Sequence, residues 1–267
     1  MHYPENFVNK IICGNCVEIM KQIPDESIDL AVTSPPYDAL RDYKGYAFFD
    51  FKATANEFHR IMKQGGVVVW VVGDATEKGS ETGTSFKQAL YFKEKGFNIH
   101  DTMIYQKNSY PYPMGNRYYQ VFEYMFVLSK GKPKTAHLLK QPTIWRQKNK
   151  HSSTTRGKNG TTKHLKYETG KKERVRDNIW KYNCGYMRST KDKIAYKHPA
   201  IFPEQLANDH ILSWSNKGDL ILDPMCGSAT TCKMAKLNNR DFIGIDISEE
   251  YCKIAEKRLM SEKCLWD

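Results

Sequence analysis

Residues 220–231 read LILDPMCGSATT, and this junction indicates the fold of the chain. We predict a short buried strand at 220–222 and a helix at 230–237. The loop between them is rich in small residues, so its backbone can approach a ligand, and the helix start offers free N–H groups. Asp246 ends the next predicted strand, 242–245, where its carboxylate can accept hydrogen bonds from both hydroxyls of a ribose. The stretch predicts a nucleotide-binding βαβ unit, although it lacks the Gly-x-Gly-x-x-Gly fingerprint of dinucleotide sites.

The two acids of this unit, Asp223 and Asp246, also have an ordinary structural explanation. An acid that follows a strand can cap a helix or solvate a loop. On the residues alone, this alternative stays open.

Strands and helices alternate in the rest of the chain outside residues 129–193. Further strands are predicted at 11–13, 28–33, 67–72, 100–105 and 123–128. Further helices are predicted at 17–22, 56–63, 86–95, 204–214 and 249–260. The apolar run VVVWVV at 67–72 is typical of a central parallel strand that is covered on both faces. The alternation predicts an α/β fold with a doubly wound, mostly parallel sheet.

Composition limits the class of protein. Hydrophobic residues make up 40% of the 267 residues, enough for the core of one large domain with or without an insertion. No apolar run reaches about 18 residues and no signal peptide is visible, so we expect a cytoplasmic protein without membrane contact. The seven cysteines are scattered, which favours reduced, buried thiols, and no metal site is expected. Cys13 and Cys16 form a C-x-x-C, but a redox dithiol is weakly supported because Cys13 ends a predicted strand.

Positive charge is concentrated in one segment. The net charge is +11, but residues 130–197 hold 20 basic and four acidic residues, a net of +16, while the other 21 basic and 26 acidic residues give −5. The aromatic residues among these bases are Trp145, Tyr167, Trp180, Tyr182 and Tyr186. Basic residues interleaved with aromatic residues favour a surface that binds nucleic acid over a stretch that is only solvated.

We expect three parts along the chain. Residues 1–135 and 194–267 are two halves of one α/β domain, and residues 136–193 are a basic insertion between them. Within the insertion, Gly, Ser, Thr, Asn and Lys dominate residues 151–163, which predicts a loop or a mobile segment.

A second junction follows the predicted strand at 28–33, where residues 34–37 read SPPY. Two consecutive prolines fix two φ angles and remove two backbone donors, so the strand stops here. The turn has free carbonyls between a hydroxyl and an aromatic ring, which suits a flat ring held by its edge and its face. A proline turn that only ends a strand is the ordinary alternative.

Four separated segments resemble motifs of the S-adenosylmethionine-dependent DNA amino-methyltransferases. Residues 223–231, DPMCGSATT, resemble the cofactor loop Asp-Pro-Phe-x-Gly-Ser-Gly-Thr-Thr, and residues 242–246, FIGID, match the strand after it. Residues 198–203, HPAIFP, look like the segment that packs beside the methionine moiety of the cofactor. Residues 33–37, TSPPY, resemble the catalytic turn. The order of the motifs, with the catalytic turn first, is that of the permuted beta group of this family.

The resemblance implies a Rossmann-like methyltransferase fold in which the cofactor strands lie beside the catalytic strands. It implies S-adenosylmethionine as the cofactor and a target-recognition region within the insertion, although residues 140–190 themselves resemble nothing known. The cofactor-binding residues that it implies are Asp223, Pro224, Gly227, Ser228, Thr230, Asp246, His198, Phe202 and Pro203.

The resemblance also implies catalysis at Ser34, Pro35, Pro36 and Tyr37, by methyl transfer to an exocyclic amine of a base. That nitrogen is a poor nucleophile because its lone pair is delocalised into the ring. The Ser34 side-chain oxygen and the Pro35 carbonyl would accept hydrogen bonds from the amine and free the lone pair. Tyr37 would stack on a flipped-out base. Transfer is expected to be direct, so no cysteine has to be a nucleophile.

Two residues depart from the family pattern. Ala229 stands where the family usually has glycine, and alanine disfavours a positive φ. Asn15 stands where an acid often follows the glycine, which leaves the contact to the adenine of the cofactor open. Residues 38–46 and 107–117 fit loops that close over a base and mobile surface loops equally well.

Ser34 bears on which base is modified. In this family SPPY usually accompanies cytosine N4 methylation, whereas Asp- or Asn-Pro-Pro-Tyr usually accompanies adenine N6 methylation. We therefore expect a site-specific cytosine-N4 methyltransferase that acts on double-stranded DNA. The alternatives are adenine N6, an RNA substrate, and a DNA-binding relative without catalysis. We expect a monomer or homodimer, with a cognate restriction endonuclease as a candidate partner.

Overall fold

The structure is a computed structural model that describes residues 2–36, 49–108, 115–143, 150–168 and 171–261. The chain divides into two compact units: residues 1–137 together with 178–267, and residues 138–177. The smaller unit lies inside the insertion expected at 136–193, and residues 178–193 group with the larger unit.

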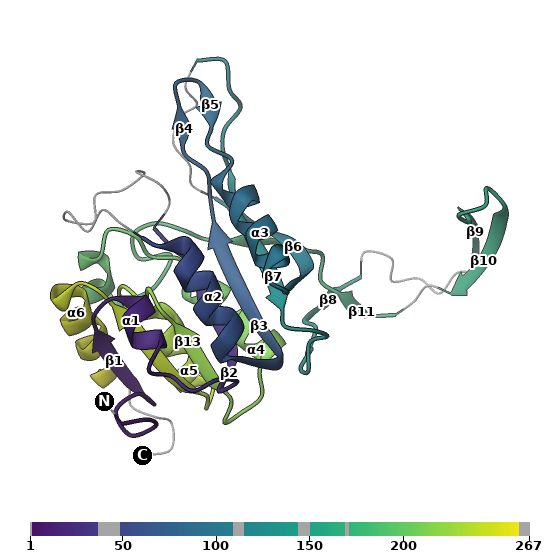
Figure 1. The fold of residues 1–267 in the computed structure, drawn as a ribbon. Coiled ribbons are helices and arrows are strands. Elements are labelled where there is room, and N and C mark those ends of the chain that lie inside the picture. Colours follow the sequence, from purple (N-terminus) through teal and green to yellow (C-terminus); the bar gives the residue numbers. More distant parts are fainter. Residues whose placement is uncertain (1, 37–48, 109–114, 144–149, 169–170, 262–267) are drawn as a thin grey trace. The chain divides into compact units, whose positions relative to one another are not determined.

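An eight-stranded sheet organises the larger unit (Figure 1). From one edge to the other, its strands are β1 (Lys10–Cys13), β14 (Asp241–Asp246), β13 (Leu220–Asp223), β2 (Ile28–Thr33), β3 (Met62–Val72), β7 (Phe122–Ser129), β6 (Asn98–Lys107) and β12 (Ile179–Tyr182). Neighbouring strands are parallel, except that β7 runs antiparallel to both β3 and β6. The mostly parallel sheet of the prediction is confirmed.

Helices cover both faces of this sheet in the described residues (Figure 1). One layer contains α1 (Cys16–Met20), α2 (Phe51–Ile61) and α3 (Thr84–Glu94); the other contains α4 (Glu204–Trp214), α5 (Thr230–Leu237) and α6 (Glu249–Met260). Right-handed crossovers explain the two layers, because connections that lead in opposite directions along a sheet place their helices on opposite faces. A hairpin of β4 (Thr76–Glu77) and β5 (Ser80–Glu81) follows β3, and a 3₁₀ helix, η1 (Lys193–Lys197), precedes α4.

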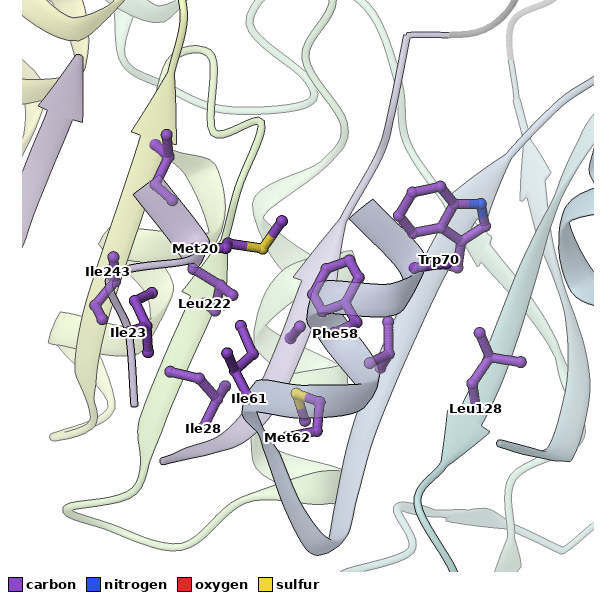
Figure 2. Packing of buried hydrophobic residues seen from close by; sticks show 14 of the residues in the cluster. Met20, Ile23, Ile28, Phe58, Ile61, Met62, Trp70, Leu128, Leu222 and Ile243 are labelled. Atoms are coloured by element: carbon purple, nitrogen blue, oxygen red, sulfur yellow. The ribbon is translucent and has the colours of Figure 1, made fainter. Parts of the chain in front are cut away.

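One large cluster of the core lies between the sheet and the layer of α1, α2 and α3 (Figure 2). The side chains of Val67–Val72 in β3 are at most 1% exposed, as expected for a strand that is covered on both faces. Trp70 is fully buried, and its indole N–H donates to Gln88 Oε1 at 2.8 Å, so burial leaves no unpaired donor there. Phe58 packs edge-on against Trp70, at 6.1 Å between ring centroids.

The two ends of the sequence meet at the centre of the sheet. β13 pairs in parallel with β2, with Ile221 opposite Leu30 and Leu222 opposite Ala31. The crossover from β2 leads to β3 on one side, and the crossover from β13 leads to β14 on the other. The boundary between β2 and β13 is therefore a topological switch point, where open α/β sheets bind their ligands.

Several predicted elements have other limits in the structure, and among the helices α2 differs most. A helix was expected at 56–63, ended by two glycines, but α2 spans Phe51–Ile61 and β3 begins at Met62. The helix begins earlier because Asp50 Oδ1 accepts a hydrogen bond from the Ala53 N–H at 3.0 Å and caps it. Gly65 and Gly66 consequently lie inside the strand.

The smaller unit contains two antiparallel strand pairs, β8 (Lys140–Pro142) with β11 (Glu173–Val175) and β9 (Lys150–Arg156) with β10 (Thr162–Glu168). The prediction of a loop at 151–163 is therefore wrong for residues 151–156 and 162–163, which lie in strands. Backbone pairing holds this hairpin, and the described side chains at 153–165 are all exposed. A strand without a buried face has no hydrophobic period of two, so the pattern did not reveal it.

Candidate active site

A cavity of about 940 Å³ lies at the carboxyl ends of the parallel strands in the larger unit. Residues at or just beyond five strand ends line it: Gly14 after β1, Ser34 after β2, Asp74 after β3, Pro224 after β13 and Asp246 at the end of β14. Parallel strands bring these positions to one edge of the sheet although they are far apart in the sequence.

Most of the predicted site residues lie on the wall of this cavity. These are Ser34, Pro35, Pro36, His198, Phe202, Pro224, Gly227, Ser228, Thr230 and Asp246. Tyr37 lies outside the described residues. Asp223 and Pro203 are buried and do not line the cavity; Pro203 directly precedes α4.

Direct hydrogen bonds join the turn after β2 to the loop after β13. The Thr33 hydroxyl donates to Asp223 Oδ1 at 2.8 Å, and the Thr231 hydroxyl donates to the Val32 carbonyl at 2.9 Å. Asp223 also accepts from the Met225 N–H at 3.3 Å. Burial raises the pKa of Asp223 to about 6, against the stabilising effect of these bonds on the carboxylate. Asp223 thus fastens the two motifs together from behind the cavity wall.

Asp246 presents a carboxylate to the cavity. The Gly227 N–H donates to its Oδ2 and the Ser248 N–H to its Oδ1, each at 2.9 Å. Burial raises the pKa of Asp246 despite both bonds. Each carboxylate oxygen has a second lone pair, so both can accept from a pair of neighbouring hydroxyls.

The loop 226–230 has an unusual backbone. Gly227 has φ +50°, and a Cβ atom built there would lie 2.8 Å from the His198 ring, so glycine lets the imidazole approach. The His198 ring packs edge-on against Tyr251, 4.3 Å between centroids. Ala229 has φ +60° and ψ +41°, which is the left-handed conformation that a residue with a Cβ disfavours. The departure from glycine at this position therefore does meet a positive φ.

Asn15, the second departure from the family pattern, also lines the cavity. Its Oδ1 accepts from the Val17 N–H at 2.9 Å and from the Glu18 N–H at 3.3 Å. The side chain is therefore the N-cap of α1, a role in which asparagine and aspartate are equally good.

Sequence reasoning missed one charged pair on the cavity wall. Lys107 Nζ lies 2.9 Å from Glu123 Oε1, and both residues line the cavity. Lys107 ends β6, and Glu123 is the second residue of the antiparallel strand β7. The end of one strand and the start of its antiparallel neighbour meet at the same sheet edge. Antiparallel pairing of the predicted strands at 100–105 and 123–128 would therefore have placed Lys107 near Glu123. Tyr105 lines the cavity too, and burial raises its pKa.

The smaller unit is a candidate nucleic-acid surface by itself. Residues 138–177 include 12 basic and three acidic residues. Arg156, Lys158 and Lys163 on the β9–β10 hairpin are exposed. Exposed lysine and arginine side chains on a hairpin without a buried face are suited to contact a phosphate backbone.

The described residues contain neither a metal-binding cluster nor a membrane-spanning helix. Within residues 2–36, 49–108, 115–143, 150–168 and 171–261, there is no group of three or more His, Cys, Asp or Glu that could hold a metal ion. Over the same ranges, no helix has the length and apolar character required to cross a membrane.

Known proteins similar to this chain are methyltransferases. The model of the N6_N4 methyltransferase family, described as DNA methylase, matches residues 28–257. The orphan methyltransferase M.BamHII of Bacillus amyloliquefaciens is 60% identical over 242 residues, which cover 90% of this chain and 91% of that protein.

Solved structures share the fold. The cytosine-N4-specific PvuII DNA methyltransferase has a TM-score of 0.69 at 20% identity, covering 95% of this chain and 86% of its own. The TTHA0409 DNA modification methylase of Thermus thermophilus, described as putative, has a structure in complex with S-adenosyl-L-methionine. It has a TM-score of 0.63 at 23% identity, covering 94% of this chain and 92% of its own.

Proposed function

This chain belongs to the N6_N4 family of S-adenosylmethionine-dependent DNA methyltransferases, and we propose that it methylates the exocyclic N4 of cytosine at specific sites in double-stranded DNA. The Ser34 hydroxyl on the cavity wall, directly after β2 and beside the loop after β13, carries this proposal.

The cavity has the donors and acceptors that the cofactor requires. Asp246 would accept hydrogen bonds from the two ribose hydroxyls. It would use the carboxylate lone pairs that the Gly227 and Ser248 N–H groups leave free. His198, Phe202, Pro224, Ser228 and Thr230 would line the methionine end, while Asp223 and Pro203 would support the wall from behind. When bound, S-adenosylmethionine supplies an electrophilic methyl group on a sulfonium.

The turn after β2 would prepare the amine. The Ser34 oxygen and the Pro35 carbonyl would accept its two hydrogens, which favours tetrahedral geometry at nitrogen and frees the lone pair. Positioning and hydrogen bonding of this kind supply most of the rate in direct transfers. In our proposal Pro36 keeps the turn rigid, and Tyr37, which lies outside the described residues, stacks on the base.

No cysteine is needed as a nucleophile. Cys226 lines the cavity, but a hydrogen bond with Cys232 and burial raise the pKa of its thiol well above the usual value. A thiol that stays protonated is a poor nucleophile, which supports direct transfer.

Adenine N6 is the second candidate, because the family includes enzymes of both kinds. A hydroxyl at position 34, in place of the carboxylate or amide of Asp- or Asn-Pro-Pro-Tyr, favours cytosine. The PvuII enzyme is named cytosine-N4-specific, but at 20% identity its likeness to this chain concerns the fold alone.

We propose that the basic insertion binds the DNA around the target. Its lysine and arginine side chains would contact phosphates, while a few other side chains would read the edges of the nucleobases in a groove. The target base must leave the duplex, at a cost of about a few kcal/mol. A monomer or homodimer in the cytoplasm, with or without a partner restriction endonuclease, completes the proposal.

The decisive experiment incubates the protein with S-adenosylmethionine that carries a labelled methyl group and with duplex DNA of varied sequence. The DNA is then digested to nucleosides, and the methylated nucleoside is identified by mass. N4-methylcytosine is the expected product. N6-methyladenine would establish the second candidate, and label in structured RNA but not in DNA would overturn the proposed substrate.

A further inference from the structure

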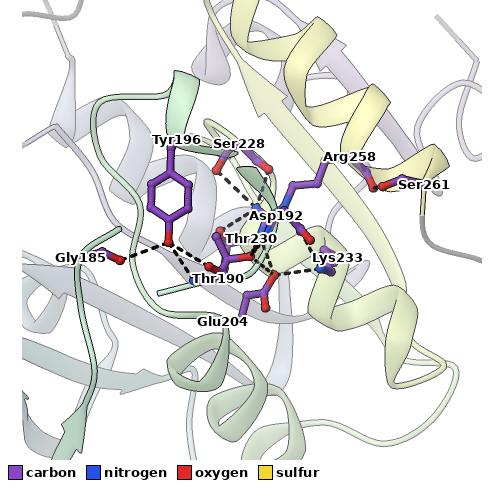
Figure 3. A network of polar contacts seen from close by, with 10 residues as sticks. All are labelled: Gly185, Thr190, Asp192, Tyr196, Glu204, Ser228, Thr230, Lys233, Arg258 and Ser261. Carbon is purple, nitrogen blue, oxygen red and sulfur yellow. Dashed lines mark hydrogen bonds and ion pairs between the residues drawn. The ribbon is translucent and has the colours of Figure 1, made fainter. Parts of the chain in front are cut away.

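Arg258 of α6 contacts both residues that flank the left-handed Ala229 (Figure 3). Its side chain is fully buried. One terminal nitrogen, Nη1, lies 2.8 Å from the Ser228 carbonyl oxygen and 3.0 Å from the Thr230 hydroxyl oxygen. A single guanidinium therefore spans the turn that Ala229 makes.

Two acids balance the charge of Arg258 (Figure 3). Its Nε donates to Asp192 Oδ2 at 2.8 Å, and its Nη2 donates to Glu204 Oε1 at 2.6 Å. Lys233, which is 5% exposed, pairs with the same two acids at 2.6 and 2.9 Å. Buried ion pairs of this kind often add little net stability compared with apolar packing, because each charge loses its hydration. The geometry that the contacts impose is therefore a better explanation for them than net stability.

That geometry is the backbone of the cofactor loop. Ala229 adopts φ +60°, which costs free energy in any residue with a Cβ, so neighbouring contacts must hold it. Ser228 and Thr230, the two residues held by Arg258, line the cavity. Without the Arg258 contacts, the left-handed Ala229 would depend on the bond from its N–H to the Cys226 carbonyl at 2.7 Å and on the bond from the Lys233 N–H to its own carbonyl at 2.9 Å, and the cavity wall could move.

The same network reaches a second part of the wall. The Thr190 hydroxyl donates to Glu204 Oε1 at 2.8 Å, and the Thr190 N–H donates to the Tyr196 hydroxyl at 3.3 Å. The Tyr196 hydroxyl also lies 3.1 Å from the Gly185 carbonyl oxygen. Gly185 and Tyr196 line the cavity, so Arg258 connects the loop after β13 to the segment that follows β12.

We propose that Arg258 is a positioning residue that holds Ser228, Ala229 and Thr230 in the conformation that binds S-adenosylmethionine. This inference rests on the cofactor placement given under the proposed function. Its geometric basis is the fork of the guanidinium, which serves two loop oxygens and two carboxylates at once.

The test compares Arg258→Lys with a matched control, Arg60→Lys. A lysine keeps the charge but cannot donate to all the groups that the Arg258 guanidinium contacts, which also include the Thr190 hydroxyl at 3.3 Å. Arg60 is similarly bonded, with the Ile23 and Met20 carbonyls at 2.8 and 2.7 Å and with the acids Asp25 and Glu57, yet none of these residues lines the cavity. The dissociation constant of S-adenosylmethionine is measured by calorimetry without DNA, the melting temperature by scanning calorimetry, and turnover at saturating cofactor.

We expect Arg258→Lys to raise the dissociation constant by about 10- to 100-fold, the size of effects from groups that orient a binding site. Turnover at saturating cofactor should stay within about twofold of wild type, because Arg258 does not touch the reacting atoms. Arg60→Lys should also lower the melting temperature, by less because the Arg60 side chain is 30% exposed, and should leave the dissociation constant within about twofold.

A rescue experiment separates positioning from general destabilisation. Glycine adopts a positive φ without strain, so Ala229→Gly should restore most of the affinity in the Arg258→Lys background and leave the dissociation constant of Arg60→Lys within about twofold. Glu204→Gln keeps the volume of an anchor of Arg258 and should raise the dissociation constant several-fold, with less risk to folding.

The inference is overturned if Arg258→Lys binds the cofactor as wild type does, if Arg60→Lys weakens binding equally, or if Ala229→Gly does not rescue. Wild-type protein that fails to bind S-adenosylmethionine would instead refute the cofactor placement itself.

Discussion

The Ser34 hydroxyl and the Asp223 carboxylate lie at the ends of adjacent strands, but they would do different work. Ser34 lines the cavity and would touch the amine. Asp223 is 2% exposed and bonds the Thr33 hydroxyl, so it acts on the position of the turn. Neighbours in space can thus be distinguished by what each side chain can reach.

Ser34→Ala should lower turnover by about 100-fold, the usual loss when one preorganised hydrogen-bonding group at the reacting atom is removed. The dissociation constant of S-adenosylmethionine should stay within about twofold. Single-turnover kinetics and calorimetry measure the two quantities. Ser27→Ala, which removes a hydroxyl that donates to the Pro24 carbonyl, is the control for loss of a serine side chain. Wild-type turnover in Ser34→Ala would contradict the role proposed for this residue.

Asp223 should make stability depend on pH. Its folded pKa of about 6 lies above the ordinary value of 3.8, so the fold favours the protonated form. The stability due to this group is fully present below about pH 4 and is lost as the pH rises through about 6, by about 3 kcal/mol in total. Asp223→Asn, neutral at every pH, should lack this loss. Urea unfolding between pH 4 and pH 8 measures it, with Glu256→Gln on the exposed face of α6 as control; parallel profiles for wild type and Asp223→Asn would refute the prediction.

At the scale of elements, strand order brings the two motifs together. β2 and β13 are about 190 residues apart in the sequence but are paired in the sheet, and Thr33 bonds Asp223 across the boundary. The β9–β10 hairpin differs, because backbone pairing holds it while its described side chains at 153–165 are exposed. The first pair contributes to the cavity wall, and in our proposal the second contacts DNA.

Replacing Arg156, Lys158 and Lys163 on the β9–β10 hairpin by Gln should weaken DNA binding. Each lost phosphate contact lowers the salt dependence of log K by about 0.9, so the triple variant should lose up to about 2 to 3 in slope. Fluorescence anisotropy at several salt concentrations measures this. The control, Lys21, Lys253 and Lys257 changed to Gln, removes as much charge from α6 and the end of α1. Equal slopes in the two triple variants would show that net charge alone matters.

For the whole molecule, the cavity wall is assembled from distant parts of the chain. Residues near 14, 34, 198, 227 and 246 all contribute. A ligand that contacts them together binds the folded state and not the unfolded chain, so it stabilises the whole larger unit.

S-adenosylmethionine at 100 times its dissociation constant should raise the free energy of unfolding by about 2.7 kcal/mol. Asp246→Ala removes the proposed ribose acceptor and should reduce this gain to less than about 0.5 kcal/mol at the same concentration, if affinity falls about 100-fold. Urea unfolding with and without cofactor measures both. Glu249→Ala, an exposed neighbour on α6, should keep the full gain; an equal gain in Asp246→Ala would refute the role of that carboxylate.

Much of this molecule could be predicted from its sequence because local patterns carry the information. The apolar run at 67–72, the loop after residue 222 and the proline turn at 34–37 each report a strand end and its neighbours. These patterns predicted the α/β class and the mostly parallel sheet, and most of the site residues that the family resemblance implied line the cavity. The β9–β10 hairpin was missed because its strands have no buried face to create a pattern.

The sequence by itself determined the class of fold and the types of residue at the strand ends, since periodicity and turn chemistry are local. Only the tertiary structure decided which of these residues reach the cavity: Asp223 lies behind the wall, whereas Lys107 and Glu123 lie on it. The tertiary structure also decided that Arg258 donates hydrogen bonds to the residues on either side of Ala229. Contacts such as Arg258 with Asp192, 66 residues apart, and Thr33 with Asp223, 190 residues apart, join distant parts of the chain. They depend on strand order and side-chain direction, which no local pattern encodes.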